Sequence, residues 1–152
     1  MDFKKVYEVM KFAGIMLAGS LVLYAGIVEF IILKGAEDRI VEGSGDAAMW
    51  RNIFVALSVS AYMVIYYIKN RMLRTRYKNF TSMVSGLYVK SVVILILCQV
   101  PAVLGLVQFF IGAGNRMDFY PFMIISALFF IIFFPRYSEW ESVMKESKGG
   151  SG

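Results

Sequence analysis

The segment Ser91–Ala113, SVVILILCQVPAVLGLVQFFIGA, decides the fold class, because it holds no charged side chain over its whole length. A transmembrane helix needs about 20 mostly apolar residues to cross about 30 Å of hydrocarbon. Phe12–Leu33 meets the same standard. Ile53–Ile68 and Phe119–Phe134 are slightly shorter, and their aromatic and amphipathic flanks can complete a crossing at the membrane interface. The sequence therefore predicts an all-α integral membrane protein with four transmembrane helices.

The composition agrees with a membrane protein and argues against an enzyme. The chain is 59% hydrophobic, with 13 Phe and 9 Tyr among its 152 residues, and its mean hydropathy is +0.64. It has no histidine and one cysteine, Cys98, so the usual metal ligands and general bases are missing. We expect no catalytic residues, metal or cofactor. Residues 1–148 are expected to form one transmembrane domain, and residues 149–152, Gly-Gly-Ser-Gly, resemble an engineered linker.

The distribution of cations predicts the orientation. Lys69–Lys78 carries several cations and no anion, which is typical of a cytoplasmic loop. Further cations stand in the two tails, at Lys4, Lys5, Lys11, Arg136, Lys145 and Lys148. By contrast, Lys34–Asn52 mixes both signs and Gly114–Asp118 is nearly neutral. Both termini are therefore expected in the cytoplasm, with the protein in the cytoplasmic (inner) membrane. The net charge of +5 is explained by this topology and by anionic lipid headgroups, without nucleic acid.

Both ends of the chain have an amphipathic pattern. After Pro135, the residues Tyr137, Trp140 and Met144 fall at i, i+3 and i+7. This spacing predicts a short helix lying on the cytoplasmic surface, and residues 2–10 repeat the pattern. Trp50 and Trp140 are then expected in the aromatic belts of the two interfaces.

Glu29 is the acidic residue that stands within an apolar segment. Such residues are costly in a membrane and are often functional. It lies about 6 Å from the outer end of its helix at 1.5 Å per residue. One interpretation is a carboxylate that reaches the interface or bonds a neighbouring helix. The other is an ion- or proton-binding group.

Gln99 and Gln108 are the two amides of the third segment. Gln99 lies near the midplane, and Pro101 removes the N–H that would bond the Leu97 carbonyl. Gln99 is expected to form an interhelical hydrogen bond or, as the alternative, a polar site. Gln108 lies at nearly the depth of Glu29, so a bond between these two side chains is a further hypothesis.

Small residues form stripes on three of the four segments, which allows helices to approach closely in lipid. These expected packing positions are Gly19 and Gly26 on the first segment, Ala56 and Ser60 on the second, and Cys98, Ala102, Gly105 and Gly112 on the third. The fourth segment carries bulky phenylalanines instead. Segments one to three are therefore predicted to pack together, with the fourth facing lipid or a subunit boundary.

The stretch Lys90–Val107, KSVVILILCQVPAVLGLV, resembles the second helix of the c-subunit (proteolipid) of rotary ATP synthases. The resemblance covers the hairpin Ile53–Val107 and centres on Ala102–Val107, which is similar to the family's AxxxGLV-like run. Gln99 falls where the family has its ion-binding carboxylate, and Pro101 departs from the pattern. The resemblance implies hairpins that assemble side by side, without a working ion site, since an amide does not exchange a proton at physiological pH.

Two functions follow from these features. The first is a non-enzymatic, proteolipid-like membrane subunit that forms a homo-oligomer, with other protein partners unknown. The alternative is a small ion- or proton-coupled transporter or channel that uses Glu29, with Gln99, Gln108, Tyr24 and Tyr62 as the polar lining. A membrane-embedded enzyme is disfavoured because the spans hold no paired acids and no histidine.

Overall fold

The computed structural model describes residues 3–34, 47–74, 79–111 and 116–149. Over these ranges the regular elements are helices, with bounds α1 Phe3–Leu33, α2 Ala47–Arg74, α3 Phe80–Ile111, α4 Arg116–Phe133 and α5 Tyr137–Gly149. Four helical stretches are long and apolar enough to cross a membrane, namely Lys4–Leu33, Ala48–Met72, Phe80–Ile111 and Arg116–Lys145. The predicted all-α fold with four such stretches is confirmed, and it is compatible with an integral membrane protein.

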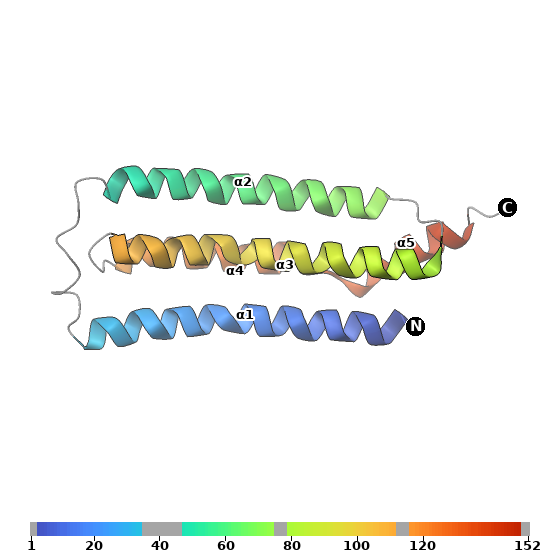
Figure 1. Cartoon of the computed structure of the whole chain (residues 1–152), viewed down its shortest axis with the longest axis horizontal. Coiled ribbons are helices and arrows are strands. Elements are labelled where there is room, and N and C mark those ends of the chain that lie inside the picture. The colour runs from blue at the N-terminus through green and yellow to red at the C-terminus, as the bar shows by residue number, and fades with distance from the viewer. Residues whose placement is uncertain (1–2, 35–46, 75–78, 112–115, 150–152) are drawn as a thin grey trace.

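The helices α3 and α4 form the centre of the bundle, and α1 and α2 lie on opposite sides of this pair (Figure 1). The centre is formed here because small side chains on α3 face large ones on α4. Gly105 and Ala102 of α3 are buried, and so are Phe122 and Phe129 of α4. The expectation that the fourth segment faces lipid is therefore wrong for this face of the helix. Its phenylalanines fill the space that the small residues of α3 leave.

One end of the bundle gathers the start of α1, the end of α2, the start of α3 and the whole of α5 (Figure 1). We call it the basic end, because Lys4, Lys5, Lys69 and Arg71 belong to these segments and Arg136 directly precedes α5. The predicted clusters of cations are thus brought to one end of the molecule, as far as they fall on described residues. Residues 75–78 of the predicted basic loop lie outside that part of the chain.

The two ends of the chain pack against the other helices. The predicted short helix after Pro135 is confirmed as α5, whereas the N-terminal stretch is not a separate helix. The N-terminal residues continue into α1 without a break, and Met10 is fully buried. Trp140 of α5 is also fully buried, packed in one apolar cluster with Met10, Met72 and Leu87. The side chain of Trp140 thus lies inside the chain and not on its outer surface.

The unequal helix lengths explain this arrangement. The 31 residues of α1 extend about 46 Å at 1.5 Å per residue, whereas the 18 residues of α4 extend about 27 Å. At the basic end α1, α2 and α3 thus continue beyond α4, and their apolar sides need another partner. After the turn at Pro135, the apolar side of α5 fills this position.

Candidate functional site

Glu29 contacts α4 through both of its carboxylate oxygens. The Tyr120 hydroxyl donates a hydrogen bond to Oε1, and Nη2 of Arg116 lies 3.3 Å from Oε2. A second ion pair at the same end joins Arg51 to Asp118 at 3.7 Å. The carboxylate is thus neutralised by a neighbouring cation and holds α1 against α4. This geometry agrees with the interpretation of Glu29 as a group that bonds a neighbouring helix.

The sequence suggests Gln108 on the third helix as a partner of Glu29, whereas the contacts of the carboxylate in the structure are with Tyr120 and Arg116 of α4. Gln108 is fully buried on α3. Tyr120 and Arg116 stand in the first turns of α4, which begins at the end of the bundle where α1 finishes (Figure 1). The depth of Tyr120 in the fourth apolar segment is a signal that could identify it, whereas Arg116 precedes that segment, Phe119–Phe134, in the sequence.

Gln99 binds α1 rather than lying free near the middle of the span. Its Nε2 donates to the Leu17 carbonyl and to the Ser20 hydroxyl, with both distances 2.6 Å. The Ser20 hydroxyl in turn donates to the Leu17 carbonyl at 2.7 Å. The amide therefore acts as a polar link between α1 and α3, as the interhelical alternative predicts.

Ser126 is a polar contact that the sequence reasoning did not identify. It is fully buried on α4, and its hydroxyl donates to the Cys98 carbonyl at 2.5 Å. This carbonyl lies one residue beyond that of Leu97, whose usual N–H partner is missing because of Pro101. The hydroxyl thus joins α4 to α3 beside the proline.

The small residues divide into two groups. A Cβ atom on Gly105 would lie 2.6 Å from Cβ of Phe122, and Cys98 and Ala102 are fully buried. These three positions lie within the chain's own core. By contrast, apart from the nearby backbone of α1 itself, no described atom lies within 4 Å of the Cβ position of Gly19 or Gly26.

The remaining predicted packing positions lie on the outside of α2 or outside the described residues. Ala56 and Ser60 are exposed, and the Ser60 hydroxyl donates to the Ala56 carbonyl at 2.9 Å. Gly112 falls outside the part of the chain that the structure describes.

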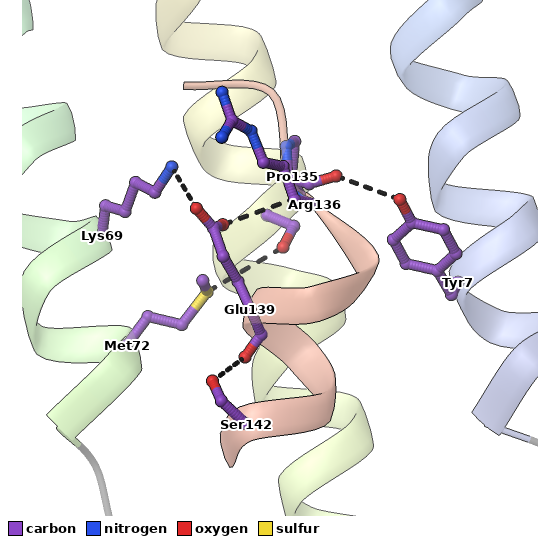
Figure 2. A network of polar contacts seen from close by, with 8 residues as sticks. Tyr7, Lys69, Met72, Pro135, Arg136, Glu139 and Ser142 are labelled. Atoms are coloured by element: carbon purple, nitrogen blue, oxygen red, sulfur yellow. Dashed lines mark hydrogen bonds and ion pairs between the residues drawn. The ribbon is translucent and has the colours of Figure 1, made fainter. Parts of the chain in front are cut away.

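A network of polar contacts fixes α5 at the basic end (Figure 2). Lys69 Nζ on α2 lies 2.8 Å from Glu139 Oε1, and the Arg136 backbone N–H donates to Glu139 Oε2 at 3.5 Å. On the other side, the Tyr7 hydroxyl of α1 donates to the Pro135 carbonyl at 3.3 Å. The Tyr7 ring also meets Trp140 edge to face, with centroids 5.6 Å apart. Contacts from α1 and α2 thus hold the start of α5.

The fold and its contacts define a helical bundle with four helical stretches long and apolar enough to span a membrane, in which Glu29, Gln99 and Ser126 join helices to one another. Within the described residues, no three His, Cys, Asp or Glu side chains are grouped so that they could hold a metal ion. Comparison with protein-family models, with curated proteins and with solved structures finds no match to this chain.

Proposed function

We propose that this chain is a non-enzymatic integral membrane protein of the cytoplasmic membrane, with four transmembrane helices and both termini in the cytoplasm. We further propose that it acts as a membrane subunit that assembles with copies of itself. The observation that carries the proposal is that polar side chains within the apolar stretches bind neighbouring helices. Glu29 and Gln99 connect α1 to α4 and α3, so they serve the assembly of the bundle.

The outer position of α1 supports self-assembly. In the most apolar stretch of α1 11% of the residues are buried inside the chain, against 44% in α3. The exposed side of α1 includes Gly19 and Gly26, where a second helix could approach closely. In addition, α2 and α3 form an antiparallel hairpin in direct contact, which is the unit that the proteolipid resemblance implies. A second copy packed on α1 would cover this face.

The test is the mass of the purified protein, measured by native mass spectrometry after gentle release from detergent. We expect one discrete oligomer. Gly19→Leu should reduce it to smaller species while each copy keeps its helical content, since apart from the nearby backbone of α1 no described atom lies within 4 Å of that Cβ position. Val103→Leu, at an exposed position of α3, is the control and should preserve the oligomer. A monomeric wild-type protein would contradict the assembly.

The transporter alternative has one observation in its favour, because the Glu29 side chain is still 39% exposed despite its two partners. If the carboxylate only joins helices, Glu29→Gln should leave ion and proton flux in liposomes at the wild-type level. The unfolding free energy should fall by about 1 kcal/mol or less, as expected for an exposed ion pair. Asp118→Asn removes the carboxylate of the second ion pair, with Arg51, and is the matched control. A flux that the wild type shows and that Glu29→Gln alone abolishes would establish the transporter instead.

A further inference from the structure

A cavity of about 300 Å³ opens between α2 and α4 towards the basic end. It is lined by Tyr62, Tyr66, Lys69 and Asn70 of α2 and by Ile132 and Phe133 of α4. Its volume lies at the lower limit of ligand sites, which span about 300–1,000 Å³. Tyr66 and Ile132 are both more than half exposed, so the cavity opens on the outer surface of the bundle.

The cavity has an apolar part formed mainly by aromatic rings. Tyr62 packs against Phe133 with ring centroids 5.4 Å apart, and its ring is stacked on Tyr66 at 6.5 Å. Together with Ile132, these rings form a wall between two helices that are apolar enough to span a membrane. An extended hydrocarbon chain suits such a wall, because both are apolar and the cavity opens towards the bilayer.

The polar part of the cavity carries a net positive charge. Lys69 and Asn70 stand at this side, and Nζ of Lys69 lies 6.0 Å from the centroid of the Phe133 ring. Lys69 is paired with Glu139 at 2.8 Å, and both side chains are mostly buried. Arg136 is exposed and is not part of the lining, but its backbone N–H donates to Glu139 and Figure 2 draws its side chain on the Lys69 side of this network. Counted over Lys69, Arg136 and Glu139 alone, the formal charge of this group is positive.

From this combination we infer that the cavity binds one anionic phospholipid, which rests on the proposed membrane location. The phosphate would lie against Lys69, Asn70 and Arg136, and an acyl chain would lie along Tyr62, Tyr66 and Ile132. Basic pockets between helices on the cytoplasmic side are a known setting for anionic headgroups. In this site the phosphate competes with Glu139 for Lys69. Removing the charge of Lys69 should therefore weaken lipid binding, whereas removing the charge of Glu139 should not.

The experiment is a titration of the detergent-purified, full-length protein with phosphatidylglycerol, followed by native mass spectrometry. Phosphatidylcholine with the same acyl chains is the reference lipid. We expect one phosphatidylglycerol to bind about five- to tenfold more tightly than phosphatidylcholine. Lys69→Gln should weaken phosphatidylglycerol binding by a similar factor. Arg136→Gln should also weaken it, and this variant leaves the Lys69–Glu139 pair in place should the first one fold poorly.

Glu139→Gln distinguishes lipid binding from a purely structural role of the ion pair. It removes the competing charge and keeps an oxygen that can accept the Arg136 N–H, so phosphatidylglycerol should bind at least as tightly as in the wild type. Lys11→Gln removes an exposed cation of α1 at the same end and should have no effect on binding.

Several outcomes would overturn the inference. They are equal binding of the two lipids, equal losses in Lys69→Gln and Glu139→Gln, and an equal loss in Lys11→Gln. Displacement of phosphatidylglycerol by inorganic phosphate at matched concentration would show a plain anion site instead of a lipid site. Carbonate extraction of cell membranes tests the membrane location separately. A protein that stays in the membrane but shows no lipid preference refutes this inference alone.

Discussion

Replacing Gly105 with leucine is expected to abolish the folded bundle, and replacing it with alanine should lower the free energy of unfolding by about 1–3 kcal/mol. A Cβ atom at this position would lie 2.6 Å from Cβ of Phe122 and 3.2 Å from the carbonyl oxygen of Phe119. Neither of these atoms is the far end of a flexible side chain, so α3 and α4 would have to separate. Circular dichroism during thermal unfolding in detergent measures the loss.

Gly19→Ala is the matched control, because it makes the same chemical change on α1 where, apart from the nearby backbone of α1 itself, no described atom lies within 4 Å. It should leave the stability unchanged or raise it by up to about 1 kcal/mol through the better helix propensity of alanine. Equal behaviour of the two alanine variants would contradict the close contact between α3 and α4. The comparison also separates contacts within the chain, which Gly105 makes, from contacts between copies, which are proposed for Gly19.

Trp140→Ala is expected to lower the unfolding free energy by about 3–5 kcal/mol, the range for truncating a large buried aromatic side chain. Trp140 is fully buried and lies in the same apolar cluster as Met10 and Met72. Its removal would leave a cavity where α5 meets the other helices. Hydrogen exchange of the α5 amides should therefore become faster, and the melting temperature should fall.

Tyr137→Ala is the control on the same helix. Tyr137 is 41% exposed, and its ring meets Tyr7 edge to face at 5.1 Å. Its truncation should cost about 1 kcal/mol, as expected for one aromatic pair near the surface. Similar small losses in both variants would support the earlier prediction, in which Trp140 belongs to an aromatic belt facing lipid.

For the polar residues inside the bundle, the sequence predicts that a partner is needed but does not identify the partner. Gln99 could be identified as an interhelical link, because an amide in an apolar span needs a partner. That its partners are the Leu17 carbonyl and Ser20 depends on which side of α1 faces α3. Likewise, the cost of burying Glu29 indicated a partner, but Tyr120 and Arg116 could be named only from the register of α1 against α4.

The helical class, the four apolar stretches and the grouping of cations can all be predicted from the amino-acid sequence. These properties depend on local hydropathy and on the length needed to cross a bilayer. Both can be evaluated over a short stretch of consecutive residues, without knowing the contacts between helices. The central position of α3 and α4 and the burial of Trp140 become visible in the folded bundle and not in the sequence. The physical reason is that a membrane span is apolar on all sides, so hydropathy does not distinguish the side that faces lipid from the side that packs. That choice follows from the fit of side chains such as Gly105 and Phe122, which are distant in sequence.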